Sequence, residues 1–114
     1  MNKRQKEILA ARLNKRVDIE KSVQIADGGG GFTESWQIFA TVWASIEPLR
    51  GREDYDNSRI HGRTNYRIVI RYMPGIETKM RVNLKGRVFN INAVMNIDEA
   101  NEMLELLAEE GVST

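Results

Sequence analysis

One polar stretch, residues 49–65, contains side chains that could act as acids, bases or nucleophiles. This stretch holds His61, the only histidine of the chain, together with four arginines and three carboxylates. A catalytic histidine needs a nucleophile or a second acid beside it, and the chain has no Gly-x-Ser-x-Gly elbow. Zinc sites need several His or Cys ligands, and cysteine is absent. We therefore expect no enzyme, no metal and no cofactor, with a site built on His61 or Glu53 as the alternative.

A run of four glycines, residues 28–31, has the composition of a loop that could cradle a phosphate. A phosphate-binding loop ends in Gly-Lys-Ser/Thr and opens a helix. Here Phe32, Thr33 and Glu34 follow the glycines, and no lysine is close. We therefore interpret the run as a flexible turn between two strands.

The composition is that of a globular chain with a single domain, residues 1–114. Without cysteine the chain can fold in a reducing cytoplasm. No apolar run approaches the roughly 18 residues that span a bilayer. No apolar segment with a cleavage site follows the basic N-terminus, so we expect neither a membrane segment nor a secretion signal.

Charge is distributed unevenly along the chain, although the net charge is only +1. Residues 1–16 carry six basic residues and one glutamate, whereas residues 98–114 carry six carboxylates and no basic residue. Two such ends could complement each other head to tail between copies of the chain. They could equally be two solvated termini.

Hydrophobic periodicity predicts one short helix followed by strands. Residues 3–13 have helical spacing, and alternating apolar residues predict strands over 17–25, 34–47, 66–72, 79–84 and 87–95. In the longest of these strands, the even-numbered residues from Trp36 through Ile38 to Ile46 should share one face. Tyr66 and Tyr72 should point to the core together with Ile68 and Ile70.

The C-terminal segment is ambiguous, because residues 100–109 have high helix propensity and yet also alternate in the manner of a strand. On local propensity Asp98 would cap a helix there. Five alternating segments joined by short turns, such as Pro74-Gly75 and Lys85-Gly86, already predict a small antiparallel barrel or sandwich.

Basic residues recur in the neighbouring hairpins, at Arg67, Arg71, Lys79, Arg81, Lys85 and Arg87. If they shared a face with aromatic platforms, the chain would be a nucleic-acid binder of the OB type. The tyrosines are expected to point inward, so a solvated outer face is favoured. A monomeric OB-like nucleic-acid-binding barrel remains the alternative function.

The ordered motifs together resemble one family, the phage head–tail joining proteins of the connector, head-closure or stopper type. The stretch from Thr41 to Glu53, TVWASIEPLRGRE, resembles the family signature, in which a Trp-Ala strand end leads into a long loop. Residues 13–19, the glycine turn, residues 66–76 and residues 86–91 follow in the family's order. The resemblance covers roughly residues 12–110, and residues 1–11 form an N-terminal extension.

The resemblance implies a small β-barrel or sandwich of about six antiparallel strands, with a short N-terminal helix and a projecting loop at residues 49–65. It favours a strand over residues 103–109. It also implies a ring of copies in the virion neck, expected to be a dodecamer there, while the lone chain can stay monomeric. The ring would join the portal or adaptor of the DNA-filled head to a tail-proximal protein, close the DNA channel without sequence-specific contact, and assemble in the bacterial host's cytoplasm. The residues expected at its interfaces are Trp43, Glu47, Pro48, Leu49, Arg50, Gly51, Arg52, Glu53, Tyr55, Arg59 and Arg63.

Overall fold

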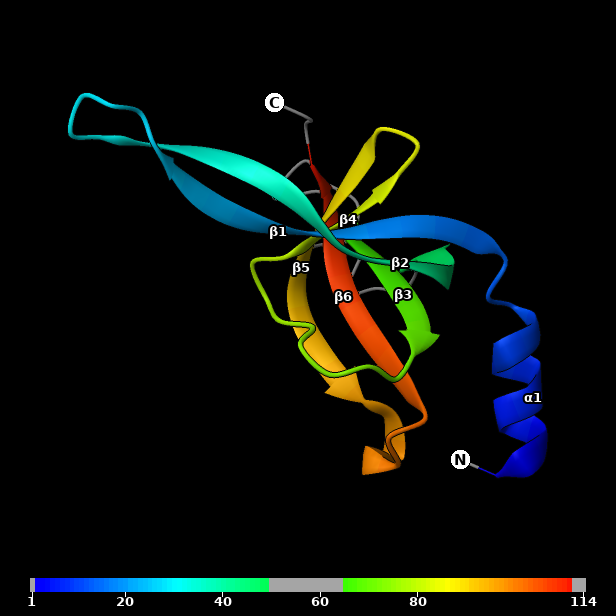
Figure 1. Ribbon diagram of the computed structural model, residues 1–114. Coiled ribbons are helices and arrows are strands. Elements are labelled where there is room, and N and C mark those ends of the chain that lie inside the picture. Colours follow the sequence, from blue (N-terminus) through cyan, green and yellow to red (C-terminus); the bar gives the residue numbers. More distant parts are fainter. Residues whose placement is uncertain (1, 50–64, 112–114) are drawn as a thin grey trace.

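The computed structural model describes residues 2–49 and 65–111, and these form one helix and six antiparallel strands. The strands close into a barrel in the order β1-β2-β3-β6-β5-β4 (Figure 1). The elements are α1 (Lys3–Ala11), β1 (Lys15–Ala26), β2 (Phe32–Pro48), β3 (Asn65–Arg71), β4 (Arg81–Leu84), β5 (Arg87–Asn96), a 3-10 turn η1 (Ile97–Glu99) and β6 (Met103–Gly111). This architecture confirms the predicted small all-β fold with a short N-terminal helix.

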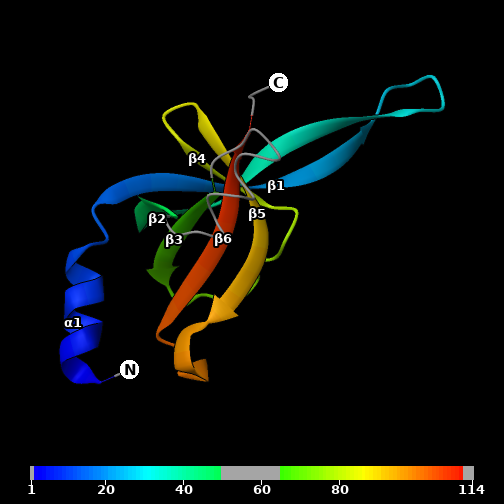
Figure 2. The ribbon, with the colours of Figure 1, turned by 180° about the vertical axis from the view of Figure 1, so that it is seen from behind.

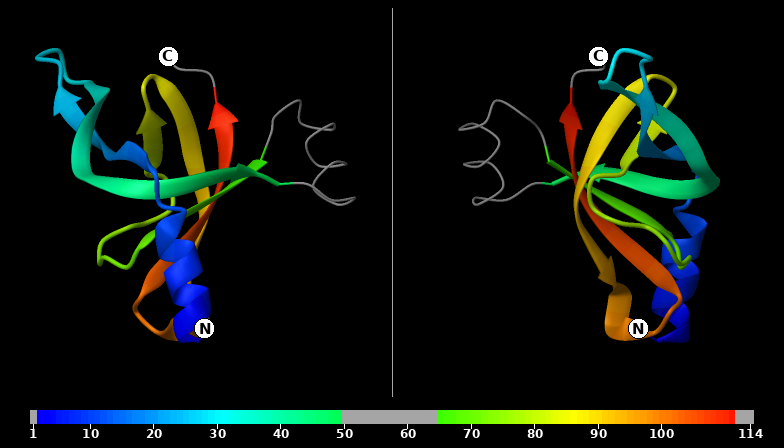
Figure 3. Two further views of the ribbon diagram at one scale, coloured as in Figure 1. Left: turned by 90° about the vertical axis from the view of Figure 1, so that its right-hand side faces the viewer. Right: turned by 60° about the vertical axis from the view of Figure 1, so that its left-hand side comes forward.

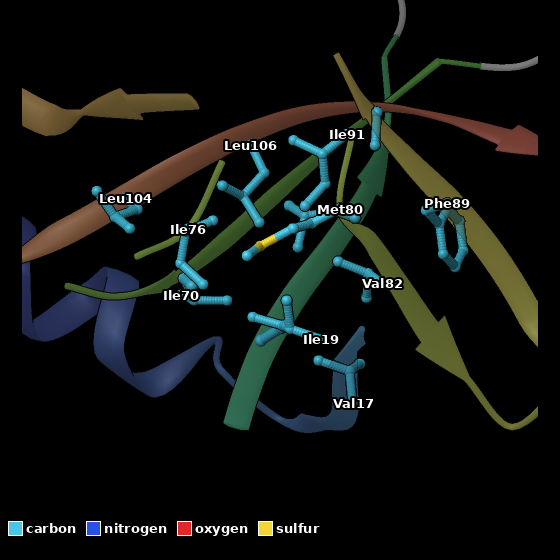
Figure 4. Packing of buried hydrophobic residues seen from close by; sticks show 13 residues of the cluster. Val17, Ile19, Ile70, Ile76, Met80, Val82, Phe89, Ile91, Leu104 and Leu106 are labelled. Atoms are coloured by element: carbon cyan, nitrogen blue, oxygen red, sulfur yellow. The ribbon is translucent and has the colours of Figure 1, made fainter. Parts of the chain in front are cut away.

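The core of the barrel is built from the inward-facing residues of all six strands. The largest fully buried side chain is Phe89, and Ile19, Ile70 and Leu106 pack within the same cluster (Figure 4). Tyr66 packs against this cluster, with its ring edge-on to Phe89 at a centroid distance of 5.0 Å. Tyr72 is 40% exposed, so its predicted inward orientation is wrong. The reason is that β3 ends at Arg71, one residue before it.

A bulge in β2 overturns the predicted single face of that strand. The register with β1 shifts between Ile19, which pairs with Ala40, and Glu20, which pairs with Ile38. Phe39 is the extra residue and packs against the core. An extra residue reverses the alternation, so Ile38 lies on the outer face and is 60% exposed. The expectation that Trp36 and Ile38 share the inner face with residues 40–46 is therefore wrong.

The C-terminal segment is a strand, as the family resemblance favoured. β6 pairs with β3 on one side and with β5 on the other, from Met103 to Gly111. These two long-range ladders outweigh the local helix propensity, because they satisfy the backbone of the segment and bury Leu104, Leu106 and Ala108. Asp98 does not cap a helix but lies in η1 with a φ of 56°.

The helix α1 packs beside the barrel through a small second cluster. Leu9 and Ala10 contact Leu13, Val69 and Met103 there. A capping box begins the helix, because the Asn2 side chain accepts a hydrogen bond from the Gln5 amide and the Gln5 side chain accepts one from the Asn2 amide. The helix ends at Ala11 rather than at the predicted residue 13, since Leu13 is drawn into the barrel wall.

The far halves of β1 and β2 leave the barrel as a long hairpin, which we call the arm and define as residues 21–38. It extends on the side of the molecule away from α1 (Figures 1 and 2). The glycine run forms its tip, where Gly28 and Gly30 adopt φ values of 83° and 89°. The Asp27 carboxylate accepts hydrogen bonds from the amides of Gly29 and Gly31 at 2.8 and 3.1 Å. The predicted turn is thus confirmed.

Candidate assembly surfaces

Trp43 lies on the outer surface of β2, beside the end of α1 and the start of β1, and is 51% exposed. Its cross-strand partner on β1 is Arg16, whose guanidinium carbon lies 5.2 Å from the centroid of the indole. Two open hollows of about 480 and 240 Å³ flank the ring, and Trp43 and Arg71 line both of them. Among the described residues no carboxylate lines either hollow. We call the surface formed by Arg16, Trp43 and Arg71 the basic face.

The predicted interface residues Glu47, Pro48 and Leu49 lie together at the end of β2. They line an open hollow of about 450 Å³ with Arg67. The Leu49 amide donates a hydrogen bond to the Asn65 carbonyl at 2.8 Å, so the β2 and β3 ends are held side by side at the mouth of the barrel. This closed stem fixes the points from which the chain leaves the barrel and to which it returns (Figure 3).

The other expected interface residues lie outside the described part of the chain. They are Arg50, Gly51, Arg52, Glu53, Tyr55, Arg59 and Arg63, and the same holds for His61. The structure therefore brings the described members, Glu47, Pro48 and Leu49, to one stem. It places Trp43 on a separate surface, beside Ala10, Leu13 and Asn14.

The acidic C-terminal strand is neutralised to a large extent within the chain itself. Glu102 pairs with Lys6 of α1, and Glu105 pairs with Arg67 of β3. Glu110 binds Arg87 of β5 with a closest N–O distance of 2.9 Å. The basic N-terminal and acidic C-terminal segments thus meet in one molecule at Lys6 and Glu102. A contact of the same kind between copies remains a prediction.

Three groups at the end of the barrel form a compact polar cluster. The Tyr66 hydroxyl donates to Glu110 Oε1 at 2.9 Å, and Arg87 donates to both carboxylate oxygens at 2.9 and 3.1 Å. The hydrogen bonds from Arg87 lower the pKa of the Glu110 carboxyl, and those to Glu110 raise the pKa of Arg87. Burial, followed by the contact with Glu110, raises the pKa of the Tyr66 hydroxyl. These shifts keep Glu110 and Arg87 charged and the Tyr66 hydroxyl protonated. The cluster is therefore a stabilising arrangement rather than a proton-transfer site.

Three of the six basic residues of the hairpins are held by carboxylates of the same chain. Arg67, Arg81 and Arg87 are each paired with a carboxylate, on Glu105, Glu20 and Glu110 respectively. Arg81 also stacks over Trp36, with its guanidinium carbon 4.0 Å from the ring centroid. Charges held in this way are less available to phosphates, so the arrangement does not favour the OB-like alternative.

The sequence analysis predicted the two strands and the turn of the arm, but not that they project from the barrel with exposed apolar side chains. Phe32 is 66% exposed and Ile25 is 48% exposed, in addition to Ile38. The sequence showed two long alternating segments joined by glycines, but nothing local indicated that barrel closure would use only the near half of each. A signal was present in their length, since the strands of 12 and 17 residues are longer than a small barrel needs.

Neither a metal centre nor a membrane-spanning helix is found in the described ranges. Within residues 2–49 and 65–111, no group of three or more His, Cys, Asp or Glu side chains is placed to hold a metal ion. The helical part of the same ranges contains no helix long and apolar enough to cross a bilayer.

Comparison with protein families decides which kind of protein has this barrel. Residues 8–111 match the family described as phage head completion protein. The chain belongs to that family. The match spans all six strands and the end of α1, so it depends on the whole fold rather than on one motif. It confirms the resemblance to phage structural proteins that the motif order indicated.

Two solved structures are similar to this head completion protein. A chain from the virion of a native gene transfer agent particle is 26% identical, with a TM-score of 0.64 over 88% of this chain and 96% of that chain. Protein SF1141 from Shigella flexneri 2a, solved in solution, is 29% identical, with a TM-score of 0.69 over 90% of this chain and 96% of that chain. Comparison with curated protein sequences gives no match. The head completion protein is thus a phage structural component of the head and tail region.

Proposed function

We propose that copies of this head completion protein form a ring in the neck of a tailed phage or prophage particle. The ring joins the portal or adaptor of the DNA-filled head to the tail-proximal protein and closes the DNA channel. The family match over residues 8–111 carries this proposal. The likeness to a chain of a gene transfer agent virion supports a position in the particle. Assembly takes place in the cytoplasm of the bacterial host.

The role is mechanical rather than catalytic. The barrel supplies a rigid body with a buried core, and the stem at Leu49 and Asn65 presents the intervening segment at one mouth of the barrel. In this proposal the loop at residues 49–65, with Arg50, Arg52, Glu53, Tyr55, Arg59 and Arg63, contacts the neighbouring ring. Many weak contacts then act together, because closure of a ring makes each further contact intramolecular.

Packaged DNA passes through such a ring without sequence-specific contact. Phosphate binding strong enough to hold DNA needs several unpaired cations on one surface. In the described ranges Arg67, Arg81 and Arg87 are engaged by carboxylates of the same chain. We therefore expect a lone subunit to bind duplex DNA weakly at physiological salt.

A complementation experiment tests the proposal. DNA-filled heads prepared without this chain, from the phage or prophage that encodes it, are mixed with purified chain and separate tails, and joined particles are counted by electron microscopy. We expect the wild-type chain to restore joining. A variant in which an Asn-Gly turn replaces residues 50–64 should fold, because Leu49 and Asn65 are already hydrogen-bonded across the stem, but it should not restore joining.

The matched control is a single substitution in a different turn, with the loop at residues 49–65 left intact. Lys85→Ala alters the β4–β5 turn and should restore joining as well as the wild type does. Heads that join tails equally well without the chain would overturn the proposed function. Tight, salt-sensitive binding of duplex DNA by the lone subunit would favour the OB-like alternative instead.

A further inference from the structure

The arm is a two-stranded ribbon whose backbone edges are unpaired for most of its length. β2 pairs with β3 only from Ala44 to Pro48, and β1 pairs with β4 only from Asp18 to Glu20. Within the described residues, the backbone of the arm beyond these points pairs only between its own two strands. A two-stranded ribbon is at best marginally stable alone in water, and exposed edges invite pairing. The arm therefore has the features of a segment that is covered in its working state.

The outer face of the β1–β2 hairpin carries a strip of apolar and aromatic side chains from base to tip. Cross-strand partners in an antiparallel pair share a face. The strip consists of six cross-strand pairs, in which polar residues alternate with the apolar ones: Arg16–Trp43, Asp18–Thr41, Glu20–Ile38, Ser22–Trp36, Gln24–Glu34 and Ala26–Phe32. Phe32 and Ile38 are among the most exposed large apolar side chains of the described chain. Such a row along one face is typical of a contact surface.

Charge changes sign along this strip. The base has a net positive charge: Arg71 lines both hollows beside Trp43 and Arg16 lines the smaller one, while the single carboxylate of Asp18 accepts a hydrogen bond from Thr41. The outer part is negative, because Asp27 and Glu34 lie at and near the tip and neither forms a salt bridge with a described residue. From Arg16 at the base to Ala26 at the tip the strand runs ten residues, or roughly 33 Å, so the two charged ends do not neutralise each other within one chain.

We propose that the arm of one subunit docks on the basic face of the next subunit, with Phe32 and Glu34 of the arm against Trp43, Arg16 and Arg71. The inference rests on the proposed ring and names the contact that builds it. The acidic, apolar tip of each subunit then meets the basic face of one neighbour, and its own basic face receives the tip of the other neighbour. Tip and base are different surfaces, so the contact is heterologous, and repeating it builds a ring when the rotation between neighbouring subunits closes.

A second copy fits the two surfaces better than an unrelated partner does. The acidic tip and the basic base occur in equal numbers because one chain supplies both, and most assemblies of one chain are symmetric. Complementary charge steers the approach and suppresses the reversed docking, in which tip would meet tip. The hollows beside Trp43, of about 480 and 240 Å³, provide room for an aromatic side chain such as Phe32.

Cross-linking between copies tests the contact directly, since the chain has no cysteine of its own. Gln24→Cys places a thiol beside Glu34 on the outer part of the strip, and Asn14→Cys places one at a hollow of the basic face. In one experiment the two variants are mixed in solution at high concentration, and in a second they are assembled together into necks. Both samples are treated with a short bismaleimide. We expect a mixed dimer of Gln24→Cys and Asn14→Cys chains. The control pair, Gln24→Cys with Lys85→Cys, should give none.

Charge reversal supplies an independent measure of self-association by sedimentation. Glu34→Arg and Arg71→Glu should each weaken association about tenfold, which corresponds to roughly 1.4 kcal/mol. The double variant should recover to within about threefold of the wild type. Glu99→Arg, the same change on the β5–β6 turn, should have no effect.

The possible failures separate the arm contact from the proposed function. Copies that associate or enter necks without the Gln24–Asn14 cross-link, or with unchanged affinity after charge reversal, would overturn the arm contact and leave the ring standing. A chain that neither self-associates nor enters particles would overturn both. Salt-sensitive DNA binding that is lost in Arg71→Glu, with no self-association, would assign the basic face to nucleic acid and also overturn the arm contact.

Discussion

At the scale of single residues, this head completion protein uses its charged side chains mostly to hold its own barrel together. Glu20, Glu105 and Glu110 each bind an arginine from a different strand. Each pair joins strands far apart in sequence, such as Arg81 of β4 and Glu20 of β1. Exposed pairs contribute about 1 kcal/mol or less individually. The Arg81 and Glu20 side chains are more enclosed, at 14% and 12% exposed. All three pairs link strands that are neighbours in the barrel.

Replacing Glu110 with glutamine should lower the free energy of unfolding at pH 7 by about 1 kcal/mol, because Arg87 loses its charged partner. The folded-state pKa of Glu110 lies below its ordinary value of 4.5. Its stabilising contribution is therefore complete above pH 4.5 and is lost as the pH falls through the lowered pKa. Urea unfolding of both proteins from pH 7 to pH 3 should show their difference shrinking in acid. A difference that stays constant down to pH 3 would mean that the carboxylate charge is not the cause.

At the scale of elements, the bulge at Phe39 lets one long strand, β2, contribute to both the barrel and the arm. The Phe39 bulge turns the side chain of an extra residue into the core and reverses the faces of β2 beyond it. Lys21, a charged residue in the apolar phase of β1, extends its ammonium group to 5.9 Å from the Phe39 ring centroid. The turn at Gly75 closes over the same ring. The bulge, the lysine and the turn thus form one corner of the barrel.

A substitution at Gly75 should damage this corner specifically. An added Cβ would lie 2.7 Å from Phe39 Cζ, and the residue has a φ of +90°. Gly75→Ala should lower the free energy of unfolding by at least about 2 kcal/mol, from backbone strain and overpacking together.

Gly86→Ala is the matched control, because its φ is +93° and nothing lies within 4 Å of the added Cβ. It should cost only about 1 kcal/mol. Chemical denaturation of the two variants measures the difference. Equal losses would show that the contact with Phe39 does not matter.

At the scale of the whole molecule, a closed barrel supplies rigidity while α1, the arm and the β2–β3 stem lie on its outside (Figure 3). The overall dimensions of 56 × 33 × 25 Å reflect a body extended in one direction. The arm contributes exposed apolar surface that adds nothing to the core of a single subunit. A free subunit should therefore be less stable than one in an assembly, because docking would cover that surface.

Removing residues 1–11 should test whether the extension belongs to the barrel. The helix has no fully buried residue and contacts the barrel through Leu9, Ala10 and the Lys6–Glu102 pair. We expect the shortened chain to keep its β-sheet circular dichroism and to lose about 1–3 kcal/mol, the scale of burying one or two apolar side chains. Complete unfolding of the shortened chain would show instead that α1 is part of the folding unit.

The sequence alone determined the strands, the tight turns and the family. Alternating residues and the Pro74-Gly75 and Lys85-Gly86 pairs are local signals, because side-chain alternation and turn geometry depend on neighbouring residues. The order of motifs led to the head–tail joining family, and the match over residues 8–111 agrees. The interface residues from Arg50 to Arg63 stay a prediction.

Only the tertiary structure decided the faces of β2 and the existence of the arm, and it confirmed the C-terminal strand that the family resemblance had favoured against local helix propensity. Each depends on which distant strand lies alongside. β6 is a strand because β3 and β5 flank it, and Ile38 is exposed because the register with β1 shifts beside it. The arm projects because β3 and β4 pair with only the near halves of β2 and β1. Long-range pairing sets all three outcomes, and no local pattern in the chain encodes it.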